Sequence, residues 1–178
     1  MSDFQQLVLK RQSCRDYDAD KPIEHDKLVR CLDAARQTPS ACNSQPWSVV
    51  VVEDPAKLAE VAKATHQLGL NEYDVKARAF FVVLEEYAQL MPKIACLADS
   101  QVFAKGDLGA FTYALTLAAE AEGLGTCILG LFDRPKLREL LDIPKSQPIF
   151  MVVAVGYPAK DTVRSKVRKP IDAISRFV

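Results

Sequence analysis

Four short apolar runs, separated by segments of helical period, place the strongest constraint on what this chain can fold into. The first, Ser48–Glu53, contains four consecutive valines, which predict a strand buried on both faces. The other three runs are Ala79–Leu84, Thr126–Leu131 and Ile149–Val155. Because these strands alternate with helical patterns, the sequence predicts an α/β or α+β sheet covered by helices.

Apolar residues at helical spacing, together with capping residues, predict the helices. Asp107 is expected to cap the longest of them and Gly123 to terminate it. The segment 85–100 stays undecided between helix and loop, because Pro92 interrupts it. The expected helices extend from Ser2 or Asp3 to the run 11–15, from about Glu24 to Arg36, from Pro55 to a residue before Gly69, from Asp107 to Glu122, and from Asp133 to about Leu141.

Size and composition indicate one globular domain with its own core. The chain has 178 residues, of which 49% are hydrophobic, and its formal net charge is zero, from 23 basic and 23 acidic residues. Such a chain has no overall field to attract nucleic acid or an anionic membrane. Its N-terminus is too polar for a signal peptide, and no apolar run approaches the roughly 20 residues that span a bilayer. We therefore expect a cytoplasmic protein.

The last segment, residues 159–178, differs from the rest of the chain in charge. Six basic residues against two acidic ones give it a charge of +4, so the preceding residues carry −4. Its apolar residues Ile171, Ile174 and Phe177 come after the last strand and a charged stretch. They could return to the core of this chain or pack on a second subunit.

The five cysteines are odd in number and widely spaced, without a CxxC pair. With only two histidines in the chain, this pattern argues against both a zinc site and a disulfide framework. It favours a reducing compartment. Cys127 is interpreted as a small buried hydrophobe rather than a nucleophile.

Two basic clusters lie near opposite ends of the chain, at residues 11–15 and 166–169. The first, Arg-Gln-Ser-Cys-Arg, places two guanidinium groups and a hydroxyl within one pentapeptide. Arginine suits phosphate because its planar fork donates two parallel hydrogen bonds. Each cluster by itself is equally consistent with an exposed basic turn or a solvated face. If folding brings them together, they could converge on one anion.

Amides and hydroxyls are concentrated just before the first strand, at Ser40, Asn43, Ser44 and Gln45. Amides both donate and accept hydrogen bonds, which suits them to the edge of a heterocycle. Trp47, which follows them, is most simply a core or interface anchor.

The sequence assigns no side chain to acid–base catalysis. It contains no G-x-S-x-G elbow, no H-E-x-x-H and no evident Cys/His pair. Gly130, inside or just after a strand, would permit a ligand to approach the backbone closely. If the chain is an enzyme, a cofactor would supply the difficult chemistry.

Taken in order, these motifs resemble the FMN-dependent nitroreductase family. R-x-S-x-R stands at residues 11–15, P-S-x-x-N-x-Q-P-W at 39–47 and K-x-R-K-P at 166–170. Between the last two come a helix that ends in Gly-Leu-Gly, the segment 128–130 and a strand that closes in Gly-Tyr-Pro. The resemblance extends over nearly the whole chain, and the order of the motifs makes it specific.

The resemblance implies an α+β fold with a central mixed sheet flanked by helices. Residues 1–178 would form a single FMN-binding domain in an intertwined homodimer, with two FMN molecules at its interface. Residues 159–178 would wrap around the partner subunit, which would account for the apolar residues near the C-terminus.

The resemblance also implies which residues hold FMN. Those assigned to the phosphate and the ribityl chain are Arg11, Gln12, Ser13, Lys166 and Arg168. Those assigned to the flavin ring in the same subunit are Arg15, which would stabilise negative charge at the pyrimidine, and Leu129 and Gly130 beside N5. Those reaching the flavin from the partner are Pro39, Ser40 and Asn43, with Gln45 nearby or supporting that loop.

The activity implied is reduction of nitroaromatics, quinones or similar small acceptors by NAD(P)H, in a ping-pong hydride transfer through flavin N5. The region that forms a substrate-covering lid in longer family members is reduced here to about residues 85–105. Two alternatives stay open: another flavin reaction such as dehalogenation or ene reduction, and a non-catalytic flavin-binding or redox-sensing dimer. The chain shows no motif that would distinguish NADH from NADPH.

Overall fold

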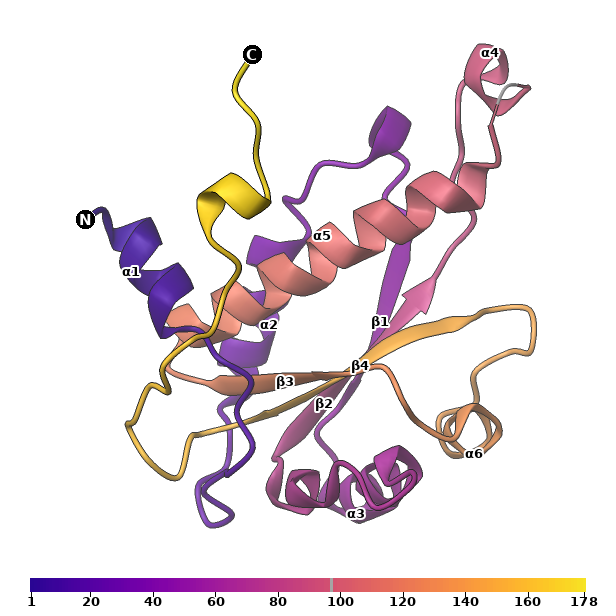
Figure 1. The fold of residues 1–178 in the computed structure, drawn as a ribbon. Helices are drawn as coiled ribbons and strands as arrows, with labels where there is room; N and C mark the ends of the chain where they lie inside the picture. Colours follow the sequence, from indigo (N-terminus) through magenta and orange to yellow (C-terminus); the bar gives the residue numbers. More distant parts are fainter. Residues whose placement is uncertain (97) are drawn as a thin grey trace.

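The four apolar runs form the strands of one antiparallel sheet (Figure 1). The computed structural model describes residues 1–96 and 98–178. The strands are β1 (Trp47–Val52), β2 (Ala79–Glu85), β3 (Gly125–Leu129) and β4 (Ile149–Gly156), in the spatial order β1-β2-β4-β3. The described part of the chain also has a parallel bridge, which joins Ser13 to Thr126 at β3. The predicted α+β fold with helices flanking the sheet is confirmed, but the four strands pair antiparallel throughout, so the expected mixed sheet reduces, among the described residues, to that isolated parallel bridge.

Most predicted helices are present with ends that differ by a few residues. Ser2 caps the first helix in a reciprocal capping box with Gln5, and Asp54 and Asp133 cap two others as predicted. The segment around Pro92 contains one short helix. The helices are α1 (Asp3–Lys10), α2 (His25–Ala35), α3 (Pro55–Thr65), α4 (Pro92–Ala95), α5 (Ser100–Ala121) and α6 (Arg134–Leu140). Short 3-10 turns are η1 (Ala41–Asn43), η2 (Glu72–Lys76) and η3 (Ile171–Ala173).

The predicted start of the longest helix is wrong. Helix α5 begins at Ser100, and its cap is Asp99, whose side chain accepts a hydrogen bond from the Gln101 amide. The helix begins seven residues earlier than predicted, and its buried face continues into this added part through Ser100 and Ala104. Asp107 therefore lies inside the helix. The region 85–105, where a reduced lid is expected, thus includes the first turns of α5, and its residue 97 lies outside the described residues.

Alternation along the central strands builds two cores, one on each face of the sheet. In β2, Phe81 and Val83 point toward α2 and α5, whereas Phe80 and Val82 point toward α3 and α6. Figure 1 shows the same division, with α5 and α2 on one side of the sheet and α3 and α6 on the other. Because both faces are covered, β2 is a continuous apolar run.

Strand β1 is less buried than its valine run predicts. Its residues up to Val51 are only half-buried, because β1 is an edge strand. Trp47, at its start, stacks on Phe111 of α5 with ring centroids 4.8 Å apart. The interpretation of Trp47 as a packing anchor is therefore confirmed.

Residues 159–178 lie outside both cores. The segment contains the turn η3 and no strand within its described residues. Ile171 is 67% exposed, Ile174 64% and Phe177 90%, so these side chains do not return to the core of this chain. In Figure 1 the segment rises beside α1 and ends away from the sheet. No helix among the described residues has both the length and the apolar character needed to cross a membrane.

Candidate cofactor site

The two basic clusters from opposite ends of the sequence meet beside α1. Lys166 donates from Nζ to the Val8 carbonyl in the last turn of α1, at 2.8 Å, where a cation is favoured by the helix dipole. Burial lowers the pKa of Lys166, and repulsion from Arg168 and Arg11 lowers that pKa further. Three cations are therefore gathered at one place, which is the arrangement an anion requires.

Arg11 contributes a buried donor to this cluster. Its Nε is buried and has no hydrogen-bond partner among the described residues. Its guanidinium carbon lies 5.9 Å from the ring centroid of Tyr113 on α5. An unpaired buried donor is costly, so an acceptor supplied by a ligand would stabilise this side chain.

One carboxylate lies near the same cations. Glu120 of α5 is 3.6 Å from the Nζ of Lys10. Burial raises the pKa of Glu120, while Lys10, Arg11 and Lys166 act in the opposite direction. Glu120 thus offsets part of the positive charge of the cluster without pairing with all of it.

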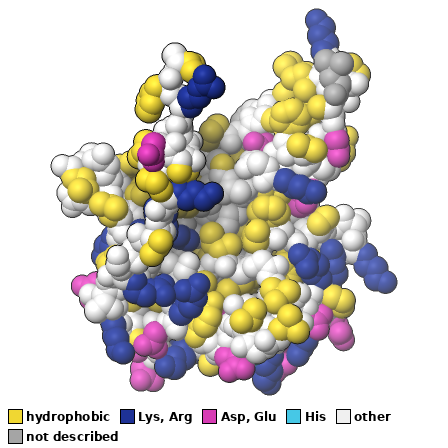
Figure 2. All heavy atoms as spheres, viewed as in Figure 1, with side chains coloured by type: hydrophobic (Ala, Val, Ile, Leu, Met, Phe, Trp, Pro, Cys, Tyr) yellow, Lys and Arg dark blue, Asp and Glu magenta, His cyan; other side chains and the backbone are white. Residues whose placement is uncertain are grey.

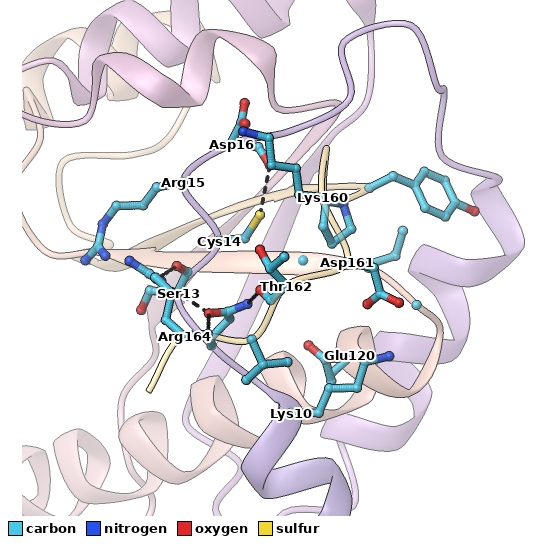
Figure 3. A pocket seen from close by; sticks show the side chains of 17 residues that line it. Lys10, Ser13, Cys14, Arg15, Asp16, Glu120, Lys160, Asp161, Thr162 and Arg164 are labelled. Carbon is cyan, nitrogen blue, oxygen red and sulfur yellow. Dashed lines mark hydrogen bonds and ion pairs between the residues drawn. The ribbon is translucent and has the colours of Figure 1, made fainter. Parts of the chain in front are cut away.

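The loop that carries Arg11 is held in an extended form against β3. Ser13 forms its parallel bridge with Thr126, and the Cys14 amide donates to the Thr126 carbonyl at 2.8 Å. Successive side chains of an extended segment point to opposite sides. In Figure 3, Cys14 points toward the cavity drawn there and Arg15 points away from it.

Gly125 makes the close approach of this loop possible. A Cβ at Gly125 would lie 2.8 Å from both Cβ and Sγ of Cys14, a distance that real Cβ atoms do not show. By contrast, the nearest atom to such a Cβ at Gly130 is the sulfur of Met151, at 3.7 Å. The close packing of this chain against itself is therefore at Gly125, whereas Gly130 keeps open space beside its backbone, as the predicted approach of a ligand there would require. The sequence signal for this close packing is the second glycine of Gly-Leu-Gly, a motif whose predicted role is only to end a helix.

Arg15 lies at the far end of the loop, over an aromatic ring. Its guanidinium carbon is 6.0 Å from the ring centroid of Tyr73. The Tyr73 hydroxyl lies 3.1 Å from the Asn71 side-chain oxygen and 3.2 Å from the Cys127 sulfur. Asn71 in turn donates to the Leu131 carbonyl at 3.4 Å. Burial of Tyr73 raises its pKa, so the hydroxyl stays protonated. This network connects Arg15 to β3, which contains the buried Leu129, and to the segment after Gly130.

The segment 39–45 lies apart from these residues. Figure 1 shows η1 projecting beyond α5, away from the loop that follows α1. The Ala41 amide donates to Asp107 of α5 at 3.0 Å, and the Gln45 amide donates to the Ser40 hydroxyl at 2.9 Å. Pro39, Asn43 and Gln45 are exposed. The fold therefore brings residues 166–168 to α1 near Arg11 and connects Arg15 through Tyr73 to β3, and it leaves the predicted residues from 39–45 facing outward.

Backbone strain is concentrated in this outward segment. Cys42 and Asn43 have φ of 53° and Gln45 has φ of 48°, in the left-handed region that costs a residue with a side chain about 1–3 kcal/mol. Asparagine tolerates this region better than cysteine or glutamine. Three such residues within four positions indicate that the loop geometry is maintained for a purpose other than its own stability.

A cavity of about 470 Å³ lies between the loop 10–16 and residues 157–164 (Figure 3). Its lining includes Gln12, Cys14 and Arg164, but not Arg11, Lys166 or Arg168. It is therefore distinct from the cation cluster. Arg164 was not predicted as a site residue, because the sequence shows it only as one more charge in a basic segment.

Comparisons with known proteins agree with one another. Residues 8–157 match the family described as the Nitroreductase family. A protein of Archaeoglobus fulgidus whose name joins NADH dehydrogenase with NAD(P)H nitroreductase is 33% identical, covering 99% of this chain and 98% of its own. An NADH dehydrogenase of Thermus thermophilus is 29% identical, covering 97% of this chain and 94% of its own.

The fold also matches solved structures. A nitroreductase of Exiguobacterium sibiricum in complex with FMN superposes with a TM-score of 0.86 at 21% identity, covering 100% of this chain and 98% of that one. The match to the family covers most of the sequence, and the architecture agrees with it. This chain is therefore a member of the nitroreductase family.

Proposed function

We propose that this protein is an FMN-dependent oxidoreductase that uses NAD(P)H to reduce small acceptors such as nitroaromatics or quinones. The observation that carries the proposal is that Arg11, Lys166 and Arg168 lie near one another, and that the buried Nε of Arg11 has no hydrogen-bond partner among the described residues. The names of the Archaeoglobus and Thermus relatives support the electron donor, and the Exiguobacterium complex supports the cofactor.

The residues present fit the phosphate of FMN. A phosphate monoester is a near-dianion with three acceptor oxygens, and guanidinium forks match its geometry. Arg11 would satisfy its buried Nε with one oxygen, while Lys166 and Arg168 would supply the remaining charge. The Ser13 hydroxyl, on the same loop, would donate a further hydrogen bond, and Gln12 would lie between this group and the ribityl chain.

Arg15 would act on the flavin ring. FMN held at this site would supply hydride acceptance at N5 from NAD(P)H and electron transfer to the acceptor, in the proposed ping-pong order. A cation held at Arg15 favours negative charge on the pyrimidine side of the ring. Leu129 and Gly130 would border the N5 edge, where the lack of a side chain at Gly130 leaves room for a ring. No side chain is assigned a proton-transfer role.

The second half of the site would come from a second copy of this chain. Pro39, Ser40, Asn43 and Gln45 face outward on a strained loop, where they could reach the flavin of a partner. In Figure 2, two projections flank a recess whose rim carries Lys and Arg side chains. Residues 1–178 would form one domain, with 159–178 lying along the partner and covering Ile171, Ile174 and Phe177.

An absorbance spectrum of the purified protein, before and after anaerobic NADH and NADPH, tests the proposal. The expected result is an oxidised flavin spectrum that bleaches on addition of one or both donors and recovers with a quinone or nitroaromatic. A flavin that does not bleach would support a non-catalytic flavin-binding dimer instead. A colourless protein that fails to take up added FMN would overturn the proposal.

A further inference from the structure

We propose that Gln12 and Arg164 form a clasp that docks the C-terminal segment and thereby assembles the phosphate site. Arg164 is a positioning residue here: it acts through Lys166 and Arg168 rather than on the cofactor. The inference rests on the proposed function, because the site that the clasp assembles is the one assigned to the FMN phosphate.

The clasp is a set of hydrogen bonds between two segments about 150 positions apart in sequence. Gln12 donates from Nε2 to the Thr162 carbonyl at 2.6 Å, and its Oε1 accepts from the Arg164 amide at 3.1 Å. One side-chain amide thus pairs with two backbone groups, as a neighbouring strand would. The Arg164 side chain adds a bond from Nε to the same Oε1 at 3.2 Å and another to the Ser13 carbonyl (Figure 3).

The clasp occupies the middle of an antiparallel series of contacts. Before it, the Asp18 amide donates to the Tyr157 carbonyl at 2.9 Å and the Ala159 amide donates to the Asp16 carbonyl at 3.0 Å. After it, Lys166 reaches the Val8 carbonyl. The two segments therefore run side by side in opposite directions, and the clasp lies between the end of β4 and the first cation of the cluster.

Within one copy of the chain, docking of this segment needs a specific attachment because apolar burial contributes little to it. Val163 is 50% exposed and Val167 90% exposed, so apolar burial contributes little on either side of Arg164. Ordering a free segment loses conformational entropy at every residue. Docking also brings Lys166 and Arg168 toward Arg11, where like charges repel. The hydrogen bonds of the clasp offset both costs before any anion is bound.

The clasp and the anion are consequently linked. Only molecules whose segment is docked present Lys166 and Arg168 to the phosphate, so the apparent dissociation constant rises as the docked fraction falls. By reciprocity, a bound phosphate favours docking by the same factor. Removal of the clasp is expected to weaken phosphate-dependent binding and leave contacts to the flavin ring unchanged.

The experiment compares FMN with riboflavin, which has the same ring and ribityl chain but no phosphate. Dissociation constants for both would be measured by flavin fluorescence on the full chain and on Arg164→Ala, Arg164→Lys and Gln12→Ala. Arg176→Ala removes a cation from the same segment, outside the clasp, and serves as the matched control. We expect about tenfold weaker FMN binding in all three clasp variants, by loss of docked population. Riboflavin affinity should stay within twofold of the parent in the two Arg164 variants, whereas Gln12→Ala, whose side chain is also placed beside the ribityl chain, should weaken FMN binding more than riboflavin binding.

Each variant separates one explanation from another. Arg164→Lys keeps the charge but loses the planar fork, so FMN binding retained in that variant alone would mean that only charge matters, and would overturn the clasp. A loss in Gln12→Ala shared equally by FMN and riboflavin would mean that Gln12 acts through the ribityl chain alone, and would also overturn the clasp. Failure of the parent protein to bind FMN would refute the proposed function itself, before any variant is made.

Discussion

Two segments expected to contact the same cofactor are treated by the fold in opposite ways. Residues 11–15 are paired with β3, packed over Gly125 and joined by cations from the other end of the chain. Residues 39–45 are exposed for the most part, hold three residues at positive φ and are attached to α5 through Asp107. The first segment is packed against the body of the fold, and the second is a strained loop directed outward.

This difference indicates how a small domain can hold a large planar cofactor. In the proposed site a single chain would supply the cations for the phosphate, because these must be held near one another. A flavin ring also needs a surface on its opposite side, which the outward loop of the same chain does not supply in the proposed arrangement. A second copy would provide it, and strain in the loop is tolerated because its contacts with the partner and the ligand would offset the cost.

The largest expected effect comes from the interior segment. Arg11→Ala removes the guanidinium whose Nε is buried, and hydrogen bonds to charged groups contribute about 1.5–3 kcal/mol each. FMN affinity, measured by fluorescence titration, should fall roughly tenfold to a hundredfold. Arg176→Ala, which removes an exposed cation, should change it less than twofold. Equal effects of the two substitutions would show that the cluster acts only through overall charge.

A substitution behind the same loop should act on stability. Gly125→Ala places a Cβ against Cys14, and overpacking of this kind costs about 1–3 kcal/mol. The loop between Ser13 and Arg15 must then shift, so FMN affinity should fall together with the midpoint of urea unfolding. Gly106→Ala is the contrasting case, because a Cβ there meets no atom within 4 Å. A Gly125→Ala protein as stable as the parent would show that the loop is not closely packed.

The sequence predicted most of the elements but not the contacts that connect them. The apolar runs located β1 to β4 within a few residues, because burial on a sheet face leaves a visible pattern. The start of α5 was missed because Ser100–Gly106 has a weak apolar face. The clasp could not be predicted, since most of its hydrogen bonds join Gln12 or Arg164 to backbone groups, and a contact with backbone leaves no signal in the residue types of its partner.

The assignment of 39–45 to a partner subunit can be tested with mixed dimers. A chain with Arg11→Ala would be co-expressed with a chain carrying Ser40→Ala and Asn43→Gly, and doubly tagged dimers would be isolated. If the two segments serve different subunits, one of the two sites contains no substitution, so about half of the parental FMN should bind. If both segments serve the same subunit, each site is damaged and binding should match that of the weaker homodimers.

The choice of substitution in that loop matters for the interpretation. Asn43 has φ of 53°, and glycine adopts this conformation at no steric cost, so Asn43→Gly removes the amide without adding strain. Asn43→Ala would combine loss of the side chain with loss of the loop geometry. A neutral hydrogen bond contributes about 0.5–1.5 kcal/mol, so loss of one from each of the two side chains should weaken FMN binding by the double-variant homodimer roughly fivefold to a hundredfold.

The smallest expected effect concerns the attachment of the outward segment. Asp107→Ala removes the acceptor of the Ala41 amide and frees one end of η1, whereas Asp107→Asn retains an acceptor oxygen there. Because one hydrogen bond near the surface is involved, Asp107→Ala should weaken FMN binding only about threefold, and Asp107→Asn less. Hydrogen exchange of the Ala41 amide should increase in the first variant. Faster exchange without any change in FMN affinity would mean that the loop geometry does not contribute to cofactor binding. The difference between segments 11–15 and 39–45 would then concern folding and not the cofactor.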